Sequence, residues 1–218
     1  MPPVQAIIFD LDGTLLNTLD DLAESMNRVL DRLGYPTHQT EAYKYFVGEG
    51  IEKLVYRVLP LKARDDKSVS DCVAAMRKEY DCHWKDRTVP YDGIETMLSE
   101  LVRRQIKLAV LSNKPHRFTE MTVSHYFPKW HFDEIAGAVT DIPRKPDPAG
   151  ALRIIEKMKI PAENFLFLGD SGIDMKTANS AGIYAIGALW GFRTENELLE
   201  SGAKKLISQP EGILNLIG

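Results

Sequence analysis

The sequence predicts an α/β protein with a doubly wound parallel sheet that is interrupted by one helical insertion. Four short apolar runs, at residues 6–9, 108–111, 165–168 and 183–189, are typical of strands that are buried on both faces. Amphipathic helical patterns separate the later runs, and alternation of strand and helix indicates a parallel sheet. The gap between the first two runs is much longer and contains helical patterns without a convincing strand.

The long gap predicts a separate helical unit over residues 17–87, inserted into a core made of residues 1–16 and 88–218. Thr18 and Asp21 resemble a capping box, and a stripe of apolar residues follows them as far as Gly34. A second stripe, from Val69 to Trp84, has spacings of three and four residues. We therefore expect two long helices that pack against each other.

Two helices of the core have recognisable ends. Pro148 suits a first helical position after the sequence Asp147-Pro148, and a second helical pattern runs from Ser171 to Ala181 before Gly182. In a sheet of this kind, ligands bind beyond the carboxyl ends of the strands. Polar residues at those ends are therefore the candidates for a functional site.

Composition excludes several classes of protein. The formal net charge of −4 argues against a nucleic-acid-binding protein, which normally carries a basic excess. No apolar run approaches the roughly 20 residues that a membrane span needs. Cys72 and Cys82 lie ten residues apart in one predicted helix, about 15 Å along its axis, which is too far for a disulfide. Together with the lack of a signal peptide, this predicts a cytoplasmic protein.

The first strand ends in two carboxylates, Asp10 and Asp12, followed by Gly13. Two negative groups so close together repel each other unless a cation or a proton lies between them. The pair therefore indicates either a site for a hard metal ion or an acid/base pair. The alternative is a solvated Asp-Gly turn.

Other strand ends carry complementary groups. Ser112 and Asn113 can donate hydrogen bonds to phosphate oxygens without adding charge, although they could simply cap a helix. Lys145 lies in a loop, where a surface lysine is the usual interpretation. Asp170 and Asp174 follow the third run, and Asp174 could merely favour the start of a helix.

These segments would converge on one crevice at the carboxyl edge of the sheet. The resulting site would hold several carboxylates, one lysine and neutral hydrogen-bond donors, without a histidine cluster. His116, the histidine nearest to a motif, is interpreted as a surface residue at a helix start. This set of groups suits Mg²⁺ and phosphate.

The four motifs, in order, resemble those of the haloacid dehalogenase superfamily of phosphohydrolases, and the match spans nearly the whole chain. The segments 112–115, 144–148 and 189–193 look like the phosphoglycolate phosphatase branch. The resemblance implies a Rossmann-like catalytic core, an inserted α-helical cap, Mg²⁺ as cofactor and a small phosphorylated metabolite as substrate. It implies nothing about oligomeric state.

The resemblance also implies a role for each matching residue. Asp10 would be the nucleophile and Asp12 the general acid/base, both also metal ligands, and Ser112 with Asn113 would hold the transferring phosphoryl group. Lys145 would balance the negative charge. Asp170 would be a further metal ligand, and Asp174 would support the metal's water shell or orient Lys145.

The helical insertion resembles the cap that gives such enzymes their specificity. Gly48 and Glu49 lie in a segment like the cap loop that approaches substrate. Phosphosugar mutases of the superfamily usually have an arginine in this loop, whereas Glu49 stands here. Lys53 or Arg57 could instead bind a substrate carboxylate, unless each is a solvated helix residue.

The function predicted is therefore Mg²⁺-dependent hydrolysis of small phosphate monoesters through an aspartyl phosphate. The alternatives are a phosphosugar mutase and, from a different class, a non-catalytic phosphate-binding module of the same fold. A dehalogenase and a phosphonatase fit less well, because the pattern at Asp12 belongs to phosphoryl transfer. A nicotinamide-binding protein would need a Gly-x-Gly-x-x-Gly motif after a strand, which is not found.

Overall fold

Six parallel strands form the main sheet of the structure, a computed structural model that describes residues 3–217. Their order is β5-β4-β1-β6-β7-β8. The strands are β1 (Ala6–Phe9), β4 (Lys107–Pro115), β5 (Glu134–Ala138), β6 (Phe165–Gly169), β7 (Tyr184–Ala188) and β8 (Lys205–Ile207). All five ladders are parallel, which confirms the predicted class of sheet. The edge strands β5 and β8 were not predicted.

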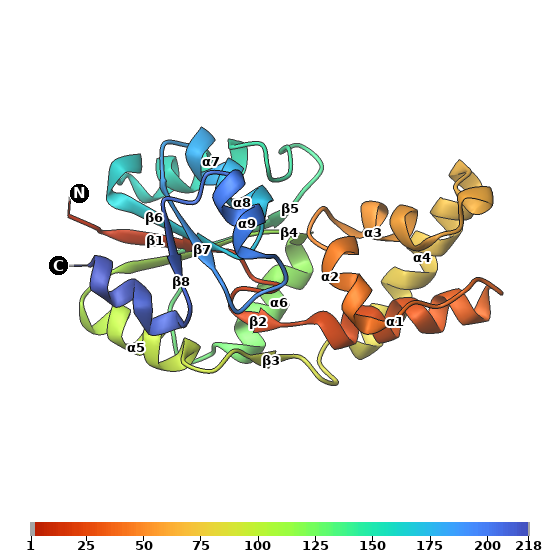
Figure 1. Cartoon of the computed structure of the whole chain (residues 1–218). Helices are drawn as coiled ribbons and strands as arrows, with labels where there is room; N and C mark the ends of the chain where they lie inside the picture. The colour runs from red at the N-terminus through yellow and green to blue at the C-terminus, as the bar shows by residue number, and fades with distance from the viewer. Residues whose placement is uncertain (1–2, 218) are drawn as a thin grey trace. The chain divides into compact units, whose positions relative to one another are not determined.

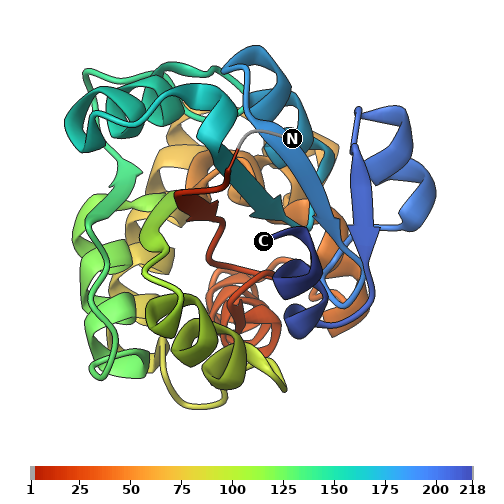
Figure 2. The same cartoon turned by 90° about the vertical axis from the view of Figure 1, so that its left-hand side faces the viewer.

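Helices cover both faces of the sheet, as Figures 1 and 2 show. The helices of this part of the chain are α5 (Ile94–Arg103), α6 (His116–Tyr126), α7 (Ala149–Met158), α8 (Gly172–Ser180) and α9 (Glu195–Glu200), with 3₁₀ segments η3 (Ala162–Asn164) and η4 (Pro210–Leu216). Strand β1 explains the two layers. Its side chains alternate, so Ile7 and Phe9 pack in the core with α5, α6 and η4. Ala6 and Ile8 pack in the opposite core with α7, α8 and α9.

The chain divides into two units, Met1–Leu16 with Pro90–Gly218 and Asn17–Val89. The sequence predicted the second boundary after residue 87, two residues earlier. The second unit contains α1 (Leu19–Arg32), α2 (Tyr43–Phe46), α3 (Ile51–Val58), α4 (Asp66–His83) and 3₁₀ segments η1 (Thr40–Ala42) and η2 (Leu61–Ala63). The strands β2 (Leu16–Asn17) and β3 (Val89–Pro90), where the chain passes between the units, pair in a small sheet of their own.

The two long helices of the second unit pack against each other, as the apolar stripes predicted. Met26 of α1 and Met76 of α4 are both buried in this unit. Leu33, which the first stripe also included, is the C-terminal cap of α1 and is 42% exposed. No helix among the residues described is both long and apolar enough to cross a membrane.

The predicted capping box at the start of α1 is wrong. Thr18 is the N-cap residue, but its side chain makes no capping hydrogen bond and its buried Oγ1 lacks a partner among the described residues. The Asp21 carboxylate instead accepts hydrogen bonds from the backbone N–H groups of Arg87 and Thr88, both at 2.9 Å, and from Thr88 Oγ1 at 2.6 Å. Because these donors lie at the end of the insertion, Asp21 ties its first helix to its last segment.

Candidate active site

Lys145 joins two carboxylates, that of Asp10 after β1 and that of Asp174 in the first turn of α8. Its Nζ donates to Asp10 Oδ1 at 2.7 Å and to Asp174 Oδ1 at 2.6 Å. Asp10 directly follows β1, and its backbone N–H continues the ladder by donating to Leu168 O. The Lys145 side chain is only 4% exposed. Its positive charge is therefore held among carboxylates away from water, and the paired carboxylates raise the pKa of Lys145 above its ordinary value against the opposing effect of burial.

The start of α8 orients Asp174. The Ser171 N–H and hydroxyl both donate to Asp174 Oδ2, at 3.1 and 2.6 Å. One carboxylate oxygen thus caps the helix while the other accepts from Lys145. The sequence left two interpretations of Asp174 open, a residue of the first helical turn and a site residue. Its contacts fit both.

Asp170 is held from two sides by polar donors and by two glycines. Thr14 Oγ1 donates to one of its oxygens at 3.1 Å, and the backbone N–H of Phe192 donates to the other at 2.7 Å. A Cβ atom at Gly13 or at Gly191 would collide with the Asp170 side chain. Both positions need glycine because the chain passes so close to this carboxylate, and Gly13 also has a positive φ of 93°.

Three buried carboxylates could hold a metal ion together. Asp10, Asp170 and Asp174 each offer an oxygen, and these oxygens lie within 4.8 Å of one another. Burial and the charge of Asp174 raise the pKa of Asp10 well above its ordinary value and that of Asp170 to about 7. When all three carboxylates are ionised, Lys145 alone does not balance their charge, and a bound cation would. An all-oxygen donor set with this charge fits a hard divalent cation such as Mg²⁺.

Asp12 has a lysine partner that sequence analysis did not assign. Lys114 Nζ donates to Asp12 Oδ1 at 2.9 Å, and the lysine side chain is 5% exposed. The backbone N–H of Lys114 also donates to Ser112 Oγ at 3.2 Å. The pairing of β4 with β5 is irregular between Leu111 and Pro115, so this hydrogen bond, and not regular strand alternation, shows that residues 112 and 114 lie together. The available signal for Lys114 was its place in the polar segment 112–115 after the second apolar run.

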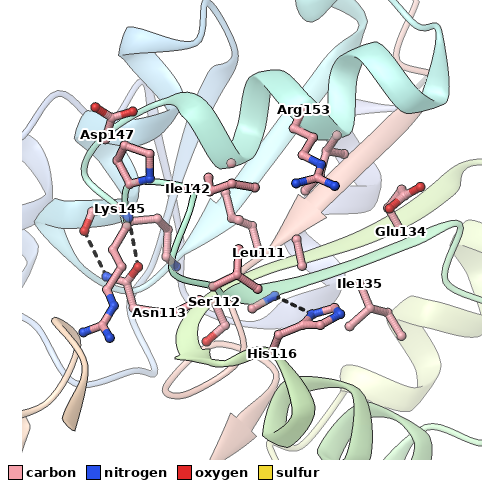
Figure 3. A pocket seen from close by; sticks show the side chains of 18 of the residues that line it. Leu111, Ser112, Asn113, His116, Glu134, Ile135, Ile142, Lys145, Asp147 and Arg153 are labelled. Atoms are coloured by element: carbon pink, nitrogen blue, oxygen red, sulfur yellow. Dashed lines mark hydrogen bonds between the residues drawn. The ribbon is translucent and has the colours of Figure 1, made fainter.

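Asn113 faces away from Ser112 and binds the backbone of the lysine loop. Its Nδ2 donates to Lys145 O, and its Oδ1 accepts from the Lys145 N–H, both at 2.9 Å (Figure 3). This pair of hydrogen bonds fixes the loop that carries Lys145. The geometry therefore favours a positioning role for Asn113, whereas the predicted contact of its side chain with substrate stays a prediction.

His116 begins α6, as predicted, and is not part of the cluster that Asp10, Asp170 and Asp174 form. Its Nδ1 accepts a hydrogen bond from the Gly137 N–H at 3.3 Å, which ties the start of the helix to β5 (Figure 3). This contact gives the residue a structural role.

Comparison with known proteins identifies the family of the chain. Residues 7–188 match the family of haloacid dehalogenase-like hydrolases. The chain belongs to this family. A phosphoglycolate phosphatase from Pseudomonas putida is 33% identical over 85% of this chain and 70% of its own length. Another from Vibrio cholerae is 28% identical over 98% of this chain and 96% of its own length.

Solved structures of the haloacid dehalogenase-like family have the same fold. A protein of known crystal structure from Lactobacillus delbrueckii subsp. bulgaricus is 28% identical in sequence to this chain. The two structures match over 99% of this chain and 98% of that one, with a TM-score of 0.93. A haloacid dehalogenase-like hydrolase from Streptococcus pneumoniae, 22% identical, has a TM-score of 0.88 over 99% of both chains. The family resemblance predicted from four motifs is thus confirmed along nearly the whole chain.

The expected substrate-binding residues of the second unit lie in and after the loop between α2 and α3. Gly48 is exposed, and Glu49 forms an ion pair with Arg57 of α3. Arg57 also donates to Phe46 O at 3.2 Å, so its guanidinium holds the loop. Lys53 is an exposed residue of α3. Contact between Gly48, Glu49 or Lys53 and a substrate stays a prediction.

Proposed function

We propose that this haloacid dehalogenase-like hydrolase is a Mg²⁺-dependent phosphatase that hydrolyses 2-phosphoglycolate or a closely related small phosphate monoester. The observation that carries the proposal is the buried Asp10 carboxylate at the end of β1, which accepts a hydrogen bond from Lys145 and lies close to the carboxylates of Asp170 and Asp174. The names of the Pseudomonas and Vibrio relatives support the choice of phosphoglycolate.

Each reacting step can be assigned to a residue of the chain. An oxygen of Asp10 attacks phosphorus, the bond from phosphorus to the ester oxygen breaks, and Asp12 donates a proton to the departing oxygen. Asp12, now a carboxylate, takes a proton from the water that attacks phosphorus of the aspartyl phosphate. Inorganic phosphate leaves, and the Asp10 carboxylate and the Asp12 acid are restored.

The surrounding groups reduce the repulsion between an anionic nucleophile and an anionic substrate. Lys145 binds Asp10 and brings a permanent positive charge to the site. Ser112 Oγ accepts from the Lys114 N–H, which leaves its own proton available to a phosphoryl oxygen. Asp10, Asp170, Asp174 and the backbone carbonyl of Asp12 would hold Mg²⁺, which when bound supplies charge neutralisation at the phosphoryl group.

The loop before α3 favours a phosphatase over the mutase alternative. Glu49 stands where phosphosugar mutases of the superfamily usually have an arginine, and Arg57 is engaged by the Glu49 carboxylate. The non-catalytic alternative is disfavoured because the nucleophile, its lysine and the acid/base are all present. The location in the cytoplasm stays a prediction.

Release of inorganic phosphate tests the proposal. We expect release from 2-phosphoglycolate in the presence of Mg²⁺, and its loss with a chelator. Asp10→Asn should reduce turnover by at least about 10³-fold, because the amide is not a nucleophile, while circular dichroism and melting temperature remain close to those of the wild type. A well-folded Asp10→Asn variant with full activity would refute the mechanism. A rearranged sugar phosphate without net phosphate release would instead support the mutase.

A further inference from the structure

We propose that Lys114 positions Asp12 for proton transfer, by holding one oxygen of its carboxylate so that the other can meet the ester oxygen of the substrate. The inference rests on the proposed phosphatase function and adds to it a positioning residue that acts through the general acid/base. It starts from the ion pair between Lys114 Nζ and Asp12 Oδ1 at 2.9 Å.

The main sheet brings the two side chains together. Strands β1 and β4 are neighbours, and they pair in parallel as far as Phe9 with Val110. Asp12 follows this pair by three residues on one segment, and Lys114 follows it by four on the other. The ion pair therefore joins the loop that carries the acid/base to the strand beside it.

Lys114 is a firmer support than a surface lysine would be. Its side chain is 5% exposed, and its backbone N–H donates to Ser112 Oγ at 3.2 Å. A buried ammonium group that left the Asp12 carboxylate would lose a charge-assisted hydrogen bond that water replaces poorly. The pair of Lys157 with Glu134, by contrast, has a lysine that is 48% exposed, and exposed ion pairs restrain little.

The Asp12 carboxylate is the side chain that requires a support. It is 21% exposed, and an aspartate has three staggered positions about its first side-chain torsion. Its Oδ1 accepts from Lys114, whereas its Oδ2 makes no hydrogen bond with another residue that the structure describes. One oxygen is thus held while the other is available to a substrate.

The same contact serves both protonation states of Asp12. As a carboxylate, Asp12 accepts from the ammonium group through Oδ1. As an acid with its proton on Oδ2, it still offers Oδ1 as a carbonyl oxygen that accepts a hydrogen bond. A general acid must come within roughly 2.6–3.2 Å of the oxygen that it protonates, so a support that persists in both states keeps Asp12 ready for each step.

The dependence of the rate on the leaving group tests the inference. The substrates are 2-phosphoglycolate and its sulfur analogue, S-(carboxymethyl) phosphorothioate, in which sulfur replaces the ester oxygen. A thiol is a much stronger acid than an alcohol, so the thiolate leaves without help from Asp12, whereas the alkoxide requires a proton. In Lys114→Met we expect kcat/KM to fall by roughly 10- to 100-fold for the oxygen ester, the cost of a displaced catalytic group, and by less than about 3-fold for the sulfur ester.

The matched control is Asn113→Ala. Asn113 binds the backbone of Lys145, and Lys145 serves the nucleophile Asp10 whichever group leaves. This variant should therefore lower kcat/KM for the two esters by a similar factor. Lys157→Met, which removes the exposed ion pair with Glu134, should leave both values as in the wild type.

Each outcome separates this inference from the proposed function. If Lys114→Met lowers kcat/KM equally for both esters, the lysine serves the phosphoryl group or the fold, and the inference is wrong. It is also wrong if neither value falls. If the wild type releases phosphate from neither ester, the proposed function itself fails. Should Lys114→Met not fold, Lys114→Gln, whose side chain is shorter and uncharged, takes its place, and equal losses for the two esters would again overturn the inference.

Discussion

Neighbouring residues at the end of β4 have different tasks because their side chains meet different parts of the site. Ser112 and Lys114 share one side, where Lys114 reaches Asp12, and Asn113 binds the backbone of Lys145 from the other. The sequence therefore predicted the right segment, but it grouped Ser112 and Asn113 as one phosphate-binding pair. The bend of a loop more than thirty positions away decides what Asn113 meets, and local sequence does not contain that information.

Removal of the Asn113 amide should impair catalysis through Lys145. We expect Asn113→Ala to lower kcat by about 10-fold or more and to cost about 1–3 kcal/mol of stability, because the Lys145 N–H and C=O lose buried partners. Kinetics with urea unfolding measure both effects. The matched control is Asn164→Ala, which removes a side-chain hydrogen bond to Pro3 O in the same unit. That variant should lose stability but keep its kcat, and an equal loss of kcat in both would contradict a positioning role for Asn113.

Among the elements, those with strong local patterns were predictable and those defined by their neighbours were not. Strands β1 and β6 are apolar runs that are buried on both faces, and the sequence located them within one residue. Strand β5 has only partly buried residues, and β8 has three residues, so neither has a distinctive pattern. Both lie at edges of the sheet, where pairing with one neighbour creates the strand.

The hydrogen bonds at the start of α1 lead to a prediction about the stability of the protein. Asp21→Asn should destabilise the protein by about 2–4 kcal/mol, because a buried carboxylate that accepts three hydrogen bonds becomes an amide facing two N–H donors. Thr18→Val should leave stability unchanged or raise it, since the Thr18 hydroxyl is buried without a partner among the described residues. A working capping box would make Thr18→Val cost about 0.5–2 kcal/mol instead. Urea unfolding of the two variants distinguishes these arrangements.

For the molecule as a whole, the carboxylate cluster predicts how stability depends on pH. Burial and the charge of Asp174 raise the pKa of folded Asp170 to about 7 from an ordinary value of 3.8. The folded protein thus binds this proton more tightly than the unfolded chain does. The stability that the protonated Asp170 carboxyl gives the folded protein is complete below about pH 4 and is lost as the pH rises towards about 7. The raised pKa of Asp10 acts in the same direction.

With a chelator, we therefore expect the melting temperature to fall between about pH 4 and pH 7. With Mg²⁺, the fall should become smaller or reverse, because a bound cation stabilises the charged carboxylates. The difference between the two conditions is the informative quantity, since histidines and surface groups titrate in both. A difference that does not grow with pH would argue against metal binding by these carboxylates.

The position of β1 in the sheet has a consequence for how the protein is made. It pairs with residues 107–110 of β4 on one side and with residues 165–168 of β6 on the other. A ribosome completes β1 first, yet neither partner exists until much later, and contacts so distant in sequence are slow to close. The helical insertion, residues 17–89, has its full sequence available earlier. The strand that is synthesised first therefore has both of its partners only after residue 168 has been made.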